Sequence, residues 1–314
     1  MELNAVRARA IAAWEELYSV AEAAIGIARM PSVAALQRWL RDAQRWSTEE
    51  LRAWQGERLC GVLAAHGVAE VRNADAAFGA LRTLPPRDLM PVERWATTST
   101  GPMRTTQLAV QIGSLLDWYH LRRGERWAFL GAPPFRGNGI RTTMAVERIA
   151  RRDRSLAGYE LDPLTSRRRL RAASSGRYGL WFGDASTLRA MADAAVGFGL
   201  PPAGPKLVVS TGEALAPSER THLASVFGCV VLDQFTWRGV PLAISCRAGR
   251  YHVVDPFSIV EVLDGTKPCE DEASGELVVT RLDERGPAML RVRTGDRAIA
   301  AGDGCPCGRP GPTL

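Results

Sequence analysis

Short apolar runs alternate with helical patterns between residues 127 and 232, and this alternation restricts the fold more than any other feature of the sequence. The last two runs are joined by a helical pattern that begins near Pro217 and ends at Gly228. Proline is favoured in the first turn of a helix and glycine just beyond its end, so both boundaries are well marked. Strands that alternate with helices predict a largely parallel sheet with helices on both faces. The four runs predicted as strands are Trp127–Leu130, Tyr178–Phe182, Lys206–Ser210 and Cys229–Leu232.

The segments on either side of this alternation have a different pattern. Before about residue 79, Ala and Leu recur at helical spacing, and Ser47 with Glu50 predicts a capping box at one helix start. Beyond residue 240, β-prone runs separated by turns predict a small antiparallel sheet or barrel-like subdomain. These runs are Tyr251–Val254, Ser258–Leu263, Glu276–Thr280 and Met289–Arg293. We therefore predict an α/β protein with a helical N-terminal part (1–94), an α/β core (95–240) and a β-rich subdomain (241–314).

Composition narrows the class of protein and its compartment. The 314 residues are 46% hydrophobic and 24% charged, values typical of a globular protein with a sizeable core. No apolar run approaches the length of a membrane span, and no apolar signal segment follows Met1. We therefore expect a cytoplasmic protein without a membrane partner. In that compartment the six cysteines are better interpreted as thiols or metal ligands than as a disulfide framework.

The net charge of +6 comes almost entirely from arginine, because lysine occurs only at Lys206 and Lys267. The arginines are scattered among acidic residues, and no recognition helix or aromatic RNA-binding motif is present, so a nucleic-acid partner is not expected. The densest cluster has two interpretations. It forms either a solvated helix face or a docking site for a phosphorylated ligand such as coenzyme A. Its members are Arg167, Arg168, Arg169 and Arg171.

Two cysteine-containing pairs have the composition of a metal site. Cys246 and His252 are separated by five residues, and Cys305 and Cys307 by one. Three thiols and one imidazole are the number and type of ligands that hold a closed tetrahedral zinc ion, which has a structural role. The alternative is that these cysteines are ordinary small hydrophobic residues and that His252 is a surface residue at the start of a strand. No such pairing is visible for Cys60, Cys229 and Cys269.

Six segments follow one another in an order that is more specific than any one of them. They are Leu51–Gln55 with Arg58 and Leu59, Thr97–Met103, Ser210–Leu215, Gly275–Thr280, Arg291–Asp296 and Cys305–Arg309. In this order the chain resembles the phenylacetate–coenzyme A ligase family and, more loosely, the adenylate-forming superfamily. The resemblance covers roughly residues 45–314.

The resemblance implies a role for residues in three of these segments. A loop of small hydroxyl residues and glycine wraps a triphosphate with its N–H groups and hydroxyls. The Gly-Glu segment precedes the helix beneath the adenine, and the aspartate accepts hydrogen bonds from the ribose hydroxyls. Without the resemblance, the aspartate would be interpreted as a turn residue that bonds its own backbone. The nucleotide residues implied are Ser99, Thr100 and Gly101, then Gly212 and Glu213, then Asp296. In some family members, residues equivalent to Cys246, His252, Cys305 and Cys307 bind zinc.

Three departures from the family pattern affect the expected chemistry. Thr98 replaces a glycine of the phosphate loop, and no lysine follows Gly101. The segment Phe235–Gly239 lacks the family's Thr and Glu, and this Glu normally helps to hold magnesium against the phosphates. The family also continues into a C-terminal domain with a catalytic lysine, whereas this sequence ends at Leu314.

Two functions of different class remain open. The first is an acid-activating enzyme of the aryl/acyl–coenzyme A ligase type, in which a carboxylate attacks the α-phosphate of ATP and forms an acyl-adenylate and pyrophosphate. Its cofactors would be ATP or AMP, Mg²⁺ and coenzyme A beside structural zinc, and a protein partner would supply the C-terminal domain or the acyl acceptor. An acyl pocket would lie near Phe135, Phe182 and Trp237, unless these are plain core residues. The second is a catalytically degenerate, zinc-stapled domain that binds a nucleotide or a partner protein. In either case we expect the chain alone to be impaired as an enzyme.

Overall fold

The structure, a computed structural model, describes most of the chain after residue 38 and divides it into two compact units. The described residues are 39–88, 119, 121, 127–130, 154–156, 162–175, 178–200, 204–237, 240–254, 256–282, 289–301 and 304–314. One unit comprises the described residues of 119–231, and the other those of 39–88 and 232–314.

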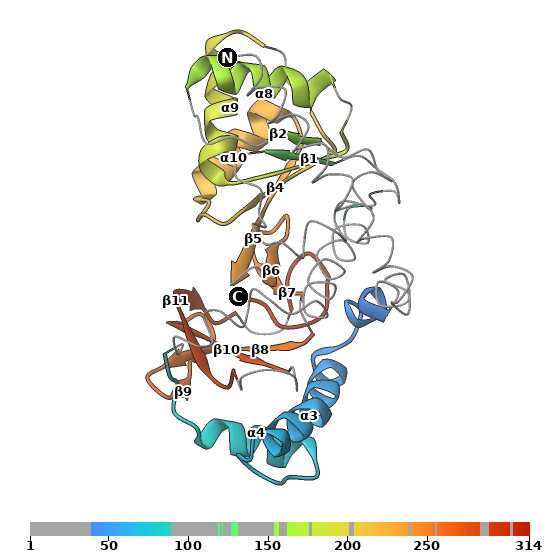
Figure 1. Ribbon diagram of the computed structural model, residues 1–314, viewed down its shortest axis with the longest axis vertical. Helices are drawn as coiled ribbons and strands as arrows, with labels where there is room; N and C mark the ends of the chain where they lie inside the picture. The colour runs from blue at the N-terminus through green and yellow to red at the C-terminus, as the bar shows by residue number, and fades with distance from the viewer. Residues whose placement is uncertain are drawn as a thin grey trace, which may run out of the picture. The chain divides into compact units, whose positions relative to one another are not determined.

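The first unit contains the strand–helix alternation that the sequence predicts (Figure 1). Strands β1 and β2 pair in parallel, as do β1 with β3 and β3 with β4. Seven strands form one sheet in the order β2-β1-β3-β4-β5-β6-β7. Mixed α/β architecture with a largely parallel sheet is thereby confirmed. The elements of this unit in chain order are β1 (Trp127–Leu130), β2 (Arg154–Leu156), α8 (Pro163–Ser175), β3 (Leu180–Gly183), α9 (Ala185–Gly197), β4 (Leu207–Thr211) and α10 (Pro217–Phe227). Strand β5 (Val230–Trp237) follows, and from Leu232 on it belongs to the second unit.

The helix ends of this unit follow from local chemistry. Asp184 caps α9 by accepting a hydrogen bond from the N–H of Thr187 at 2.7 Å. Asp162 precedes α8 and accepts hydrogen bonds from Thr165 and Leu164, and those from Thr165 hold its pKa below the usual value. Helix α10 ends as predicted, with Gly228 in the left-handed conformation at φ 65°.

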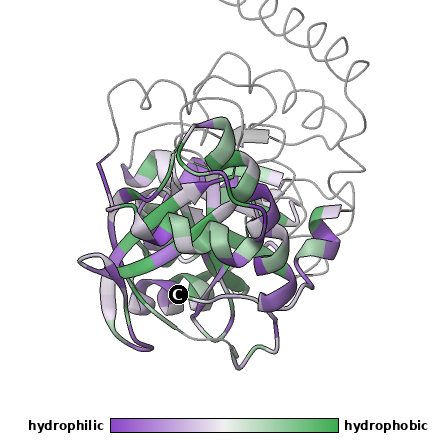
Figure 2. Cartoon of the chain, turned by 90° about the horizontal axis from the view of Figure 1, so that it is seen from below, coloured by the Kyte–Doolittle hydropathy of each residue, from purple (hydrophilic) through white to green (hydrophobic). Residues whose placement is uncertain are grey.

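Both faces of this part of the sheet are buried. On one face, alternate strand residues such as Trp181 and Val208 form a core with α8, α9 and α10. Trp181 and Phe227 meet edge to face, with ring centroids 5.4 Å apart. Helix α9 is buried along one side, with Leu188 and Met191 among its buried residues. Figure 2 shows that the coloured helices visible from below carry both hydrophobic and hydrophilic residues. The opposite strand face is at most 5% exposed and comprises Trp127, Phe129, Leu180, Phe182, Leu207 and Val209.

The second unit contains, besides the strands between Leu232 and Val253, two described helices and a small antiparallel sheet. Strands follow the order β11-β10-β8-β9 in this sheet, as the β-rich pattern predicts. The capping box at the start of α3 is present, since Glu50 and Ser47 exchange hydrogen bonds of 2.8 and 3.1 Å. The elements are α3 (Thr48–Ala65), α4 (Ala74–Thr83), β8 (Ser258–Asp264), β9 (Lys267–Pro268), β10 (Ser274–Arg281) and β11 (Val292–Ile299).

One predicted strand belongs to a different sheet from the one expected. Residues Tyr251–Val253 form β7, which pairs antiparallel with β6 (Val240–Ser245) at the edge of the seven-stranded sheet. A tight turn causes this, because the N–H of Cys246 donates to the carbonyl of Arg250 at 2.8 Å and folds β7 back onto β6. The β6–β7 hairpin therefore extends the large sheet, and only later strands form the small one.

Candidate functional site

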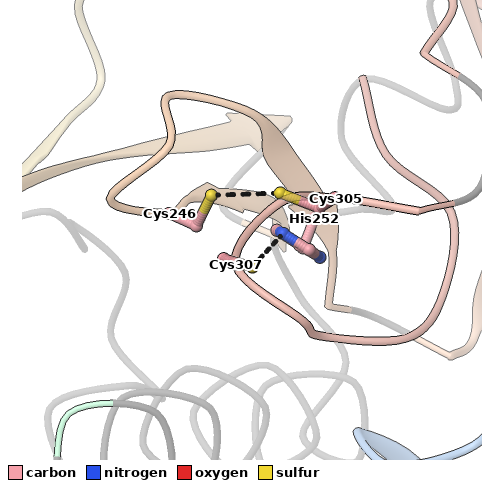
Figure 3. A group of neighbouring side chains, drawn as sticks. All are labelled: Cys246, His252, Cys305 and Cys307. Carbon is pink, nitrogen blue, oxygen red and sulfur yellow. Dashed lines mark hydrogen bonds between the residues drawn. The ribbon is translucent and has the colours of Figure 1, made fainter.

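Four side chains that the sequence pairs as metal ligands meet in one cluster (Figure 3). Their ligand atoms all lie within 4.8 Å of one another. The sulfurs of Cys246 and Cys305 are 3.5 Å apart, and the sulfur of Cys307 is 3.2 Å from Nε2 of His252. Cys246, His252 and Cys305 are buried, and Cys307 is half-buried. The structure thus brings together residues that are far apart in the sequence, since Cys246 and Cys307 are separated by 61 positions (307 − 246).

Two turns and a hairpin position these ligands. Cys246 stands directly after β6, and His252 is the middle residue of β7. Gly249 closes the turn between them at φ 87°, and its N–H donates to the carbonyl of Cys246. The second turn is closed by Gly308, at φ 78°, whose N–H donates to the carbonyl of Cys305 at 2.9 Å. Glycine is required at these positions because other residues rarely adopt positive φ.

The segment after the second turn lies along β7 and holds the two pairs together. Tyr251 and Leu314 exchange two backbone hydrogen bonds of 3.0 and 2.8 Å. The N–H of Val253 donates to the carbonyl of Pro312 at 3.1 Å. This pairing is a long-range contact between short segments, so no local sequence pattern predicts it.

The geometry fits a metal ion better than a disulfide. A disulfide holds its sulfurs about 2.05 Å apart, far less than the 3.5 Å between Cys246 and Cys305. Around a tetrahedral zinc ion, metal–sulfur distances of about 2.3 Å place two sulfurs about 3.8 Å apart. A sulfur and a nitrogen would be about 3.6 Å apart by the same geometry. The observed spacings are slightly shorter, and all six cysteines are free thiols.

The protonation of the cluster also suits metal binding. Burial, reinforced by the cations of Arg309 and Arg250, lowers the pKa of His252 to about 4, so its imidazole is neutral at pH 7. Burial raises the pKa of Cys305 to about 11. Burial acts in the same direction on Cys307, but hydrogen bonds, including those from Arg309, outweigh it and lower that pKa. Metal binding at this cluster must therefore displace thiol protons.

The nucleotide residues implied by the resemblance fall in three places. Ser99, Thr100 and Gly101 lie outside the described residues. Gly212, at φ 80°, follows β4 in the first unit. Asp296 lies in β11 of the second unit.

Glu213 is engaged at a helix start. Its carboxylate accepts hydrogen bonds from the N–H of Ser186 at 2.7 Å and from the hydroxyl of Ser186 at 2.9 Å. Ser186 is in the first turn of α9, where unpaired N–H groups favour a negative charge. The side chain of Glu213 therefore joins the loop after β4 to α9.

Asp296 is exposed on a bulge of β11. The register between β10 and β11 shifts there. Arg293 pairs with Val278 and Arg297 pairs with Glu276, so a step of two residues in β10 corresponds to four in β11. The N–H of Asp296 donates to the hydroxyl of Thr294 at 3.0 Å, which fixes the turn through the backbone. The turn therefore forms through the N–H of Asp296 and the hydroxyl of Thr294, and Asp296 itself is exposed.

The described aromatic candidates are packed, whereas Arg168 and Arg171 of the arginine cluster are exposed. Phe182 and Trp237 are 1% and 7% exposed, and the ring of Phe182 lies 5.9 Å from that of Phe129. Phe135, Arg238 and Gly239 lie outside the described residues. In α8 the guanidinium of Arg167 lies 4.6 Å from the ring centroid of Phe198, and Arg169 is buried.

Two groups of residues near the metal cluster were missed by sequence reasoning. Nη1 of Arg309 is 3.7 Å from the sulfur of Cys307. Asp233 of β5 is buried and contacts both Ser245 and Tyr251. Arg309 stands two residues after a ligand, which is a usable signal, whereas nothing in the sequence links Asp233 to the hairpin.

Comparison with known proteins places the fold. Neither a protein-family model nor a curated protein matches the sequence. The structure resembles that of 2-hydroxyisobutyryl-CoA ligase in the postadenylation state with 2-HIB-AMP, at a TM-score of 0.60 and 17% identity. That match covers 90% of this chain and 66% of the ligase. An open conformation of the same ligase with 2-HIB-AMP and CoA matches with a TM-score of 0.54 and 19% identity, over 65% of this chain and 47% of the ligase. The chain therefore has the fold of this CoA ligase and spans two thirds or less of its length.

Among the residues that the structure describes, no helix combines the length and apolar character needed to span a membrane.

Proposed function

We propose that the chain is an acid-activating protein of the adenylate-forming type, in which a carboxylate attacks the α-phosphate of ATP to give an acyl-adenylate and pyrophosphate. The observation that carries the proposal is the likeness over 90% of the chain to a ligase whose structure holds an acyl-AMP. The ordered motifs support the same conclusion and favour the phenylacetate–coenzyme A ligase branch. Coenzyme A is the proposed acyl acceptor. The proposed location is the cytoplasm, because the cysteines are free thiols, as expected in a reducing compartment.

The proposed nucleotide site draws on three segments. Ser99, Thr100 and Gly101 would surround the phosphates, and Gly212 and Glu213 would lie beside the adenine. Asp296 would bind the ribose, and its exposed position on the β11 bulge supports this role. Bonds from Ser186 fix Glu213, which favours a part for this residue in shaping the loop.

We further propose that the Cys246 cluster holds one structural zinc ion. Three sulfurs and one imidazole occupy all four tetrahedral positions, which leaves none for substrate or water. The residues present fit the ion in number, donor type and spacing. The ion would tie the β6–β7 hairpin to the segment 305–314.

Acid-dependent pyrophosphate exchange, with ATP and a panel of aryl and fatty acids, tests the enzymatic proposal. We expect exchange that is slower by a factor of about 10²–10³ than the usual 1–10³ s⁻¹, because Arg238 and Gly239 replace a Thr and a magnesium-binding Glu. Restoring these two side chains in the variant Arg238→Thr/Gly239→Glu should raise the rate.

The outcome also separates the two functions. Turnover at an ordinary rate in the wild type would show that the chain is wrongly interpreted as catalytically impaired. If neither chain gives exchange with any acid while nucleotide still binds, the degenerate binding domain is the better description. The changed motif and Thr98 favour that second function.

Replacing Asp296 by alanine should weaken ATP or AMP binding by about tenfold or more. A hydrogen bond from a ribose hydroxyl to a carboxylate is charge-assisted and contributes roughly 1.5–3 kcal/mol at most. Isothermal titration calorimetry measures the change, and Asp271→Ala, another exposed acidic residue of this unit, serves as the matched control. Equal affinities for wild type and Asp296→Ala would exclude the ribose role.

A further inference from the structure

The buried residue Asp233 is bonded, once through its carboxylate and once through its backbone N–H, by two residues that immediately neighbour the proposed metal ligands. The hydroxyl of Tyr251 donates to Oδ2 of Asp233 at 2.5 Å. The N–H of Asp233 donates to the hydroxyl of Ser245 at 2.8 Å. Ser245 precedes Cys246, and Tyr251 precedes His252, so the β6–β7 hairpin carries both the cluster and the partners of Asp233.

Strand geometry explains how one hairpin serves both sites. Successive residues of a strand point to opposite faces of the sheet, so Tyr251 and His252 are directed to different sides. Ser245 pairs with Tyr251 in the hairpin register, and Gln234 of β5 pairs with Ile244, which places Asp233 in the same cross-strand row. A shift of the hairpin by one residue would reverse these faces and separate Asp233 from both partners.

The burial of Asp233 makes the hydrogen bond from Tyr251 to its carboxylate necessary. The residue is 7% exposed, and a buried carboxylate is costly unless hydrogen-bond donors satisfy it. The pairing of β5 with β6 is regular at Gln234 and Phe235 and shifts register between Phe235 and Thr236. The contacts of Asp233 to Ser245 and Tyr251 therefore hold β5 two residues before its last regular pair.

We propose that the Cys246 cluster, once it holds its metal, fixes the register of the β6–β7 hairpin, and that Ser245 and Tyr251 act as positioning residues that transmit this register to Asp233 and β5. The inference rests on the metal assignment made above and adds a role for the metal beyond closing its own turn. The stretch of β5 so positioned, Phe235–Trp237, begins the segment that departs from the nucleotide-binding pattern.

Hydrogen exchange read by mass spectrometry tests the proposal on the full chain. Zinc-loaded protein and chelator-treated protein are compared over β5 (Val230–Trp237), the hairpin and the segment 305–314, with α10 as an internal reference. Chelation should increase exchange in all three and leave α10 unchanged. The variant Tyr251→Phe should retain about one zinc by elemental analysis yet increase exchange in β5 by about tenfold, the factor that loss of one charge-assisted hydrogen bond corresponds to.

The outcomes are distinguishable. In the first, chelation increases hydrogen exchange in the hairpin and in the segment 305–314 but leaves exchange in β5 unchanged. That result would overturn the proposal that Ser245 and Tyr251 transmit the register to β5, and it would leave the metal assignment intact. If elemental analysis finds no zinc in the wild type, the metal assignment fails, and the inference fails with it. Ser245→Ala, which removes the other partner, provides a second variant should Tyr251→Phe not fold, and Ser175→Ala on α8 is the control for loss of an exposed hydroxyl. Unchanged β5 exchange in the folded, zinc-loaded variant would also overturn the proposal.

Discussion

Removing zinc from the Cys246 cluster is expected to lower the melting temperature of the protein by about 8–16 °C. Metal present at about 1,000 times its Kd stabilises the folded state by about 4 kcal/mol, and each kcal/mol corresponds to about 2–4 °C in a domain of 150–250 residues. The cluster ties the hairpin to the 305–314 segment, so these parts should lose order first. Differential scanning calorimetry with and without a strong chelator measures the shift.

Substitutions give the same test without a chelator. Cys305→Ser removes a buried ligand and should abolish stoichiometric zinc binding. Cys60→Ser is the matched control, since Cys60 lies on α3, outside the cluster, and its sulfur donates to the carbonyl of Asn73 at 3.5 Å. The assignment is wrong if purified wild type contains no metal near one equivalent and a thiol reagent titrates all six cysteines.

The pH dependence of zinc binding follows from the protonation states. The pKa of His252 is depressed to about 4, so its neutral form, which binds metal, predominates above that pH. The pKa of Cys305 is raised to about 11 in the metal-free cluster, so zinc must displace its proton at pH 7. Zinc affinity should therefore fall as the pH falls, mainly through the thiols.

The clustering of the four candidate ligands was partly predictable, because the residues of each pair are close in sequence. Cys305 and Cys307 share one turn, and the short spacing of Cys246 and His252 is compatible with a hairpin, so each pair converges by itself. The meeting of the pairs depends on Leu314 pairing with Tyr251, a contact across 63 positions, as the difference between 314 and 251 shows. Only the resemblance, not periodicity, indicates such a contact.

The sheet to which a strand belongs was harder to predict than the strand itself. Tyr251–Val253 has the β-prone composition expected, but both sheets accept such a strand. The turn after Cys246 decides between them, and its backbone hydrogen bonds have no sequence signature beyond Gly249. The parallel strands β1, β3 and β4 were clearer, because strands buried on both faces form continuous apolar runs.

The motif around Asp296 contains a residue whose importance for stability the sequence does not reveal. Arg291 is completely buried and has φ 45°, a conformation that non-glycine residues rarely adopt. Its guanidinium forms a bidentate ion pair with Glu261 at 3.1 and 3.2 Å. It also donates to the carbonyls of Leu84, Arg82 and Thr266 at 2.6, 3.2 and 3.2 Å. One side chain thus joins the end of α4 to the small sheet.

Arg291→Met should destabilise the protein by about 3–5 kcal/mol. Breaking a buried ion pair from one side leaves the other charge uncompensated, and here three carbonyls also lose a donor. Arg291→Lys should recover little of this, because an ammonium group cannot reproduce the planar fork of a guanidinium. Chemical denaturation, monitored by tryptophan fluorescence, gives the free energy of unfolding for each variant.

A double-mutant cycle separates the ion pair from the other contacts of Arg291. Arg291→Met/Glu261→Leu removes both charges, so it should be more stable than Arg291→Met alone. The carbonyls of Leu84, Arg82 and Thr266 still lack their donor in the double variant, so recovery should be partial. Arg297→Met, at an exposed arginine of β11 that donates to the carbonyl of Ser274 at 3.0 Å, should change stability by no more than about 0.5 kcal/mol. A loss below 1 kcal/mol for Arg291→Met would mean that the end of α4 is held to the sheet by apolar packing alone, through Leu81, Ile259 and Leu290.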